Sequence, residues 1–336
     1  MLTDKGKDNN LQHHGQPSLL TRAPEISGPE ILAGLVPPPE FRTADFAGYF
    51  PDARYPSQAA ARERTSSFVG QLLAKRRKAD FNIYLDGGFG VGKTHLLAAI
   101  WNSFSGRKLF GSFLEYTSLV GYLGYAKALD AMRQFQLICI DEFELDDPGD
   151  TMIMSRLLRE LDQFGTRIAA TSNTPPAALG QGRFAAEDFR REISAMANRF
   201  QMITIDGEDY RHRALEGVSP NLGPGELRQW ASSVAAHSQE LDELLLHLAS
   251  IHQVKYRKLI GDISACAISG VSEISDQLHG LRLVVFIDRL YEQQVPLRTS
   301  GNLPLSEVFS KELVESGYRK KYLRCQSRIL ALCELG

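Results

Sequence analysis

One short stretch of the sequence has the residue types and the spacing that hold phosphate groups. It follows the pattern G-x-x-x-x-G-K-[ST] and lies between an expected strand and an expected helix, which disfavours a glycine-rich turn that matches by chance. Glycines let backbone N–H groups curve around an anion, lysine neutralises the β- and γ-phosphates, and the threonine hydroxyl ligates Mg²⁺. We therefore expect a site for ATP and Mg²⁺. Its expected binding residues are Gly87, Gly88, Phe89, Gly90, Val91, Gly92, Lys93, Thr94 and the following His95.

Two acidic residues stand at the end of an apolar run further along the chain. The run covers residues 137–140, and Asp141 and Glu142 follow it directly. A magnesium ion beside a phosphate-binding loop needs a carboxylate on the opposite side, and a buried strand that ends in two acids supplies one. We expect Asp141 to hold the metal through water and Glu142 to act as the general base that polarises the attacking water. An intact glutamate here favours hydrolysis over simple binding.

A polar residue at the tip of the next expected strand is a third candidate. Asn173 follows residues 167–172, so its amide would lie between the two motifs, where it could orient the water or contact the γ-phosphate. The alternative is a turn asparagine that precedes Pro175 and Pro176.

Strands and helices alternate around these candidates. Such alternation is typical of a mostly parallel sheet that helices cover on both faces. We therefore predict an α/β fold with a three-layer αβα P-loop core, and a mainly helical C-terminal region. The expected strands are residues 81–86, 112–116, 137–140, 167–172 and 202–205, and the expected helices are residues 57–73, 94–104, 148–164, 186–198, 241–248 and 281–291.

Composition shifts divide the chain into three parts. Residues 1–30 are polar and rich in Gly, Pro, Asn and His, and we expect a flexible tail. Residues 31–215 form the expected nucleotide-binding core, which includes an N-terminal extension over residues 31–78. Residues 216–336 form the expected lid-like region.

The overall composition excludes several classes of protein. The 336 residues include 38 basic and 40 acidic side chains, and this balance argues against a protein that coats nucleic acid. No apolar run approaches the ~20 residues that cross a bilayer, so we expect a cytoplasmic protein without a membrane span. The cysteines show no paired or metal-binding spacing, and we expect them to be reduced. They are Cys139, Cys266, Cys325 and Cys333.

The order of these motifs resembles that of AAA+ ATPases, and more narrowly the ZapE family of bacterial cell-division ATPases with mitochondrial relatives. The resemblance extends over about residues 30–335. Residues 141–143 are Asp-Glu-Phe, and residues 209–213 resemble the family's D-Y-R-x-R signature. Residues 281–291 resemble its R-F-x-x-L-V-D-x-L-Y segment, and residues 327–329 its closing S-R-L.

The resemblance implies a nucleotide-dependent homo-oligomer in which an arginine from the neighbouring subunit completes each site. Arg183 best matches the family's Arg-Phe pair, and Arg199 immediately precedes the last expected strand, so the choice between them stays open. Arg190 and Arg191 lie in the same segment, and solvent-facing helix residues are the alternative for all four. Arg282 is a candidate second phosphate sensor, or else a helix cap or a partner of Asp288.

Three functions fit these observations. The first is an ATP-hydrolysing AAA+ enzyme that remodels a protein partner, which the resemblance suggests is the division-ring tubulin homologue. The second is a helicase-loader-like ATPase, because residues 92–96 also resemble that class, although the near-neutral charge makes nucleic acid an unlikely partner. The third is a scaffold that binds nucleotide without hydrolysis, for which Glu142 would be dispensable.

Overall fold

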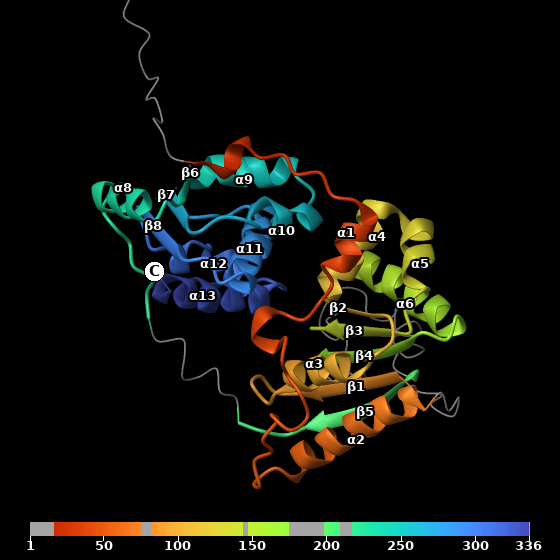
Figure 1. The fold of residues 1–336 in the computed structure, drawn as a ribbon. Coiled ribbons are helices and arrows are strands. Elements are labelled where there is room, and N and C mark those ends of the chain that lie inside the picture. The colour runs from red at the N-terminus through yellow and green to blue at the C-terminus, as the bar shows by residue number, and fades with distance from the viewer. Residues whose placement is uncertain (1–16, 75–81, 144–146, 175–197, 209–216, 336) are drawn as a thin grey trace, which may run out of the picture.

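The computed structural model describes residues 17–74, 82–143, 147–174, 198–208 and 217–335. The expected alternation forms a five-stranded parallel sheet in the order β2-β3-β4-β1-β5 (Figure 1). Because all strands run the same way, the residues that follow β1, β3 and β4 gather at one edge. The strands are β1 (Asn82–Gly87), β2 (Lys108–Ser112), β3 (Leu137–Asp141), β4 (Arg167–Ser172) and β5 (Phe200–Ile205).

Alternate residues of the central strands face two separate apolar cores. Ile138 and Ile140 of β3 pack into one core, and Leu137 and Cys139 pack into the other. All four are fully buried, as expected for a strand that is covered on both faces. The predicted three-layer αβα core is therefore confirmed. The first face packs against α4 (Phe113–Leu123), α5 (Tyr125–Met132) and α6 (Pro148–Gln163), and the second against α2 (Pro56–Leu73) and α3 (Lys93–Ser103).

The second strand lies earlier in the chain than we predicted. β2 ends at Ser112, and residues 113–116, which we expected to be extended, form the first turn of α4. The reason is a capping box: the Ser112 side chain accepts a hydrogen bond from the Glu115 backbone N–H at 3.3 Å, and the Glu115 carboxylate accepts one from the Ser112 N–H at 2.8 Å. Thr117 and Ser118, whose residue types are common at helix caps, lie inside this helix.

The C-terminal region is mainly helical, as predicted, but it also contains a parallel sheet that we did not expect. β6 (His237–Glu240), β7 (Cys266–Val271) and β8 (Leu297–Gly301) pair in that order. β6 reads His-Ser-Gln-Glu and has no apolar alternation, so its sequence gives no strand signal. The region has its own apolar core and is a second compact unit. Its helices are α8 (Pro224–Ser233), α9 (Leu241–Ser250), η5 (Gln253–Lys255), α10 (Tyr256–Leu259), α11 (Gln277–Glu292), η6 (Leu305–Glu307), α12 (Lys311–Glu315) and α13 (Arg319–Glu334).

Residues 17–36, which we call the strap, contact both units. Figure 1 shows the strap running from β6 and α9 to α4, and it contains η1 (Leu19–Thr21) and α1 (Gly28–Ala33). Leu19 is fully buried in the C-terminal core, and Ser238 donates its N–H to the carbonyl of Pro17 at 2.9 Å. At the other end, Phe110 of β2 donates its N–H to the carbonyl of Leu35 at 2.9 Å.

The expectation of a flexible tail over residues 1–30 is therefore wrong for residues 17–30. Leu19 is buried in the C-terminal core and the half-buried Ile26 packs against the nucleotide-binding core, which composition alone does not show. Residues 1–16 lie outside the described residues.

The described residues contain no helix that is long and apolar enough to cross a membrane. The four cysteines are buried, and none of them forms a disulfide.

Candidate functional site

The phosphate-binding loop connects β1 to the start of α3, as its motif predicts. Gly87 has a φ of +155°, and a Cβ atom there would lie 2.2 Å from the carbonyl oxygen of Ile205. Gly92 has a φ of +86°, and its Cβ atom would lie 2.5 Å from the ring of Tyr49. Both positions therefore require glycine. The Tyr49 hydroxyl also donates to the carbonyl of Val91 at 2.9 Å, so the N-terminal extension braces the loop.

Lys93 is the first residue of α3, and its side chain lies within the loop. Its Nζ donates to the carbonyls of Gly87 at 2.8 Å and of Gly88 at 2.5 Å. The side chain is almost completely buried. A buried ammonium group on the concave side of a glycine loop is suited to neutralise a phosphate.

Thr94 and Asp141 lie side by side at the carboxyl edge of the sheet. The Thr94 hydroxyl is 3.2 Å from both carboxylate oxygens of Asp141, and Thr171 of β4 donates a short hydrogen bond to the same carboxylate. Burial, together with the neighbouring charge of Glu142, raises the pKa of Asp141 to about 6. A hydroxyl and a carboxylate are hard oxygen ligands of the kind that Mg²⁺ prefers, so the pair fits this ion.

Glu142 faces the C-terminal unit. Its backbone has a φ of 52°, and its N–H donates to the hydroxyl of Thr171 at 3.1 Å. Its carboxylate forms an ion pair with Arg324 of α13. Burial alone would raise the pKa of Glu142, but the guanidinium groups of Arg324 and Arg328 outweigh it and lower that pKa. The carboxylate is therefore ionised and already has a partner.

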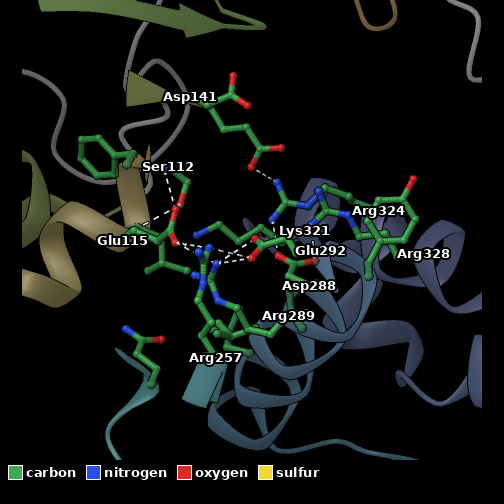
Figure 2. A pocket seen from close by; sticks show the side chains of 18 of the residues that line it. Ser112, Glu115, Asp141, Arg257, Asp288, Arg289, Glu292, Lys321, Arg324 and Arg328 are labelled. Carbon is green, nitrogen blue, oxygen red and sulfur yellow. Dashed lines mark hydrogen bonds and ion pairs between the residues drawn. The ribbon is translucent and has the colours of Figure 1, made fainter. Parts of the chain in front are cut away.

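A second set of charged residues continues from this contact and was missed in the sequence analysis. Arg324 also pairs with Asp288 of α11 at 2.9 Å, and Arg328 pairs with the same carboxylate (Figure 2). We call Glu142, Asp288, Arg324 and Arg328 the bridging cluster. The i, i+4 spacing of the two arginines places them on one face of a helix, and this was the available signal. The cluster lines a cavity of about 360 Å³ between the core and the C-terminal unit.

The other expected site residues lie in different places. Asn173 is half-buried just beyond the end of β4, the strand that pairs with β3. Arg282 lines the cavity from α11 together with Asp141 and Glu142. The His95 ring contacts the carbonyl of Asp45 at 2.8 Å, so only its backbone can face the loop.

Of the four arginines proposed to act from a neighbouring subunit, the structure describes only Arg199, and it lies away from this site. Arg199 precedes β5 at the opposite edge of the sheet and pairs with Asp162 of α6 at 2.8 Å, so it cannot serve the site of its own chain. Arg183, Arg190 and Arg191 lie outside the described residues.

Two known proteins are similar in sequence to this chain over more than two thirds of its length. The cell division protein ZapE of Escherichia coli K12 is 25% identical over 309 residues, which cover 78% of this chain and 81% of that protein. An uncharacterized protein of Schizosaccharomyces pombe is 24% identical, and the match covers 68% of this chain and 61% of that protein.

Solved structures of other proteins are more distant. DnaI is 21% identical with a TM-score of 0.43, and the match covers 52% of this chain and 97% of DnaI. AMPPCP-bound DnaA from Aquifex aeolicus is 15% identical with a TM-score of 0.40, and the match covers 67% of this chain and 65% of DnaA.

The model of one family spans nearly the whole described chain. It is the model of the AFG1-like ATPases, and it matches residues 32–241 and 226–335. These ranges include the phosphate-binding loop, the acidic pair and the bridging cluster, and the resemblance to ZapE is confirmed by the relative from Escherichia coli. The chain is an ATPase and belongs to the AFG1-like ATPase family.

Proposed function

We propose that this ATPase uses ATP hydrolysis to remodel a protein partner in the cytoplasm, with Glu142 as the general base. The contact between Glu142 and Arg324 is the observation that supports it most. It joins a carboxylate beside the phosphate-binding loop to a helix of the other unit, so a change at the nucleotide would reach the C-terminal surface.

Each part of the site has a role in this proposal. Lys93 neutralises the β- and γ-phosphates, while Thr94 and Asp141 hold Mg²⁺, which supplies further charge neutralisation on the phosphates. The attacking water forms a bond to the γ-phosphorus, the bond to the ADP oxygen breaks, and the water proton passes to Glu142. Asn173 orients the water.

Two arginine roles complete the proposal. Arg282 senses the phosphates from the cavity side. In a nucleotide-dependent homo-oligomer, Arg183 or Arg199 of a neighbouring subunit stabilises the charge on the transferred group.

The partner that we propose is a component of the cell-division machinery, because the relative from Escherichia coli is named a cell division protein. The division-ring tubulin homologue is the first candidate. A loader of nucleic-acid complexes is the alternative, and it predicts binding of single-stranded DNA that weakens steeply with salt.

The test is a pulldown with Glu142→Gln protein. This variant keeps the size of the side chain and should bind ATP normally, but turnover should fall at least ~100-fold, so that the ATP-bound complex persists. We expect it to retain a division protein in the presence of ATP, whereas Lys93→Ala protein, which cannot bind ATP, should not. Wild-type turnover by Glu142→Gln protein would refute the base assignment, and retention of DNA-bound complexes alone would favour the loader.

A further inference from the structure

The carboxylate that we assign as the general base is already occupied by a cation. Glu142 Oε2 forms its ion pair with Arg324, and both side chains are largely shielded from solvent. The backbone of Glu142 is fixed by its N–H bond to Thr171. The position of the carboxylate is therefore set by where Arg324 holds it.

Arg324 is itself fixed from the C-terminal unit. Asp288 lies between Arg324 and Arg328 and is 8% exposed, so α11 and α13 together aim the guanidinium of Arg324 at the nucleotide-binding core. The bridging cluster contains two carboxylates and two guanidinium groups and is neutral as a whole. A buried charge that loses its partner is unfavourable in free energy. Moving Glu142 out of this cluster therefore costs free energy unless another anion binds Arg324 in its place.

The carboxylate oxygen of Glu142 that contacts Arg324 accepts a charge-assisted hydrogen bond from the guanidinium group, so this oxygen is engaged by the C-terminal unit and not by an attacking water. We propose that Arg324 is a positioning residue for hydrolysis, which holds Glu142 on the C-terminal unit and limits its availability to the attacking water. The inference rests on the proposed role of Glu142. The cavity beside the cluster gives the carboxylate space to move once Arg324 releases it.

Two other roles of Arg324 make different predictions. If it were a catalytic residue that neutralises the reacting phosphate, its removal would slow hydrolysis. If it only joined the two units, its removal would lower stability and leave the rate per folded molecule unchanged.

Steady-state hydrolysis by Arg324→Ala protein separates these roles. We expect kcat without a partner to rise about 10-fold, while KM for ATP stays within about twofold, because the phosphate-binding loop is untouched. Arg324→Lys keeps the charge and should return kcat most of the way to the wild-type value. Arg319→Ala is the matched control on α13. The Arg319 side chain is exposed and, within the described part of the chain, donates only to the carbonyl of Val314, so kcat of this variant should not change.

A double variant shows whether the increase in kcat of Arg324→Ala protein depends on Glu142. Arg324→Ala combined with Glu142→Gln should be as slow as Glu142→Gln alone. A kcat of Arg324→Ala protein that falls or stays constant overturns the inference, as does a gain that survives in the double variant. If Glu142→Gln alone turns over at the wild-type rate, the base assignment fails instead. Should Arg324→Ala fail to fold, Arg324→Gln tests the same expectation.

Discussion

Thr171 is the residue through which the two acids of the site are held together. Its hydroxyl donates to Asp141 and accepts from the backbone of Glu142, so one side chain fixes both the metal ligand and the base. Thr171 occupies this place because the register of β3 and β4 sets Ile140 opposite Ala170. The next residues of the two strands, Asp141 and Thr171, therefore lie next to each other. A threonine inside a strand has no local signature of such a role.

Replacing Thr171 by valine keeps the shape of the side chain and removes both hydrogen bonds. Bonds to charged groups contribute about 1.5–3 kcal/mol, so we expect turnover to fall ~10–100-fold. Thr166→Val is the control on the same chain segment, because its hydroxyl is also buried but donates to the carbonyl of Phe135 at the other edge of the sheet. It should lose similar stability and keep turnover within about twofold. Equal losses of turnover would show that Thr171 has only a structural role.

At the scale of elements, the strap depends on a charged contact with the second sheet. Arg22 lies 2.9 Å from Nε2 of His237 in β6 and pairs with Asp262 at 2.5 Å. Burial and the charge of Arg22 lower the pKa of His237 below its usual 6.5, although Asp262 opposes them. The folded state therefore favours a neutral imidazole beside the strap.

This pKa shift predicts a pH dependence of strap docking. The stabilisation is complete above pH ~6.5, where the unfolded histidine is neutral as well, and it is lost as the pH falls toward the lower folded pKa. Asp262 has its pKa lowered by Arg22, so its own contribution is lost only in more acidic solution. We expect the amide protons of residues 19–22 to be less protected against exchange at pH 5.5 than at pH 7.5. His237→Gln should make this protection independent of pH, and an unchanged dependence would refute the assignment.

At the scale of the whole molecule, a buried ion network joins the two units away from the nucleotide. Arg289 of α11 contacts Glu115 of α4 at 2.8 Å and Glu292 at 2.7 Å, and Arg257 contacts the same two carboxylates from α10. Arg289 is 8% exposed. The network and the bridging cluster are two separate contacts between the units.

We expect Arg289→Met to uncouple the units, because it leaves the buried Glu115 with the longer of its two ion pairs, to Arg257 at 3.4 Å. Removing one member of a buried pair costs about 3–5 kcal/mol, and calorimetry should then resolve two unfolding transitions. Arg156→Met breaks an exposed pair with Glu160 and should cost less than about 1 kcal/mol. A single transition with unchanged midpoint in Arg289→Met protein would contradict this prediction.

Assembly is the second prediction at this scale. If a neighbouring subunit supplies the arginine, turnover per protomer should rise with protein concentration, and Arg183→Ala or Arg199→Ala should slow it roughly 10³-fold for the true finger. Mixing that variant with Glu142→Gln protein should restore part of the activity, since some interfaces then contain both intact residues. A rate that is independent of dilution, together with an inactive mixture, would mean that each chain completes its own site.

The parts of this site that the sequence predicted are those whose residues are close in the chain. The phosphate-binding loop is a run of eight residues, and the acidic pair directly follows its strand. Arg324 contacts Glu142 across 182 positions, and nothing in the local pattern of α13 indicates which carboxylate it meets. The strap and β6 were missed for a related reason: both are short, and tertiary contacts rather than periodicity determine their structure.

The strap also constrains the order in which parts of this chain can fold during synthesis. The N–H of Leu19 donates to the side chain of Gln239, 220 positions later, so the strap leaves the ribosome long before its docking surface exists. At ~5–20 residues per second, this interval lasts roughly 10–45 s. Throughout that time Leu19 has no apolar surface of the C-terminal unit to cover it, and the first described residues of the chain are among the last to reach their final place.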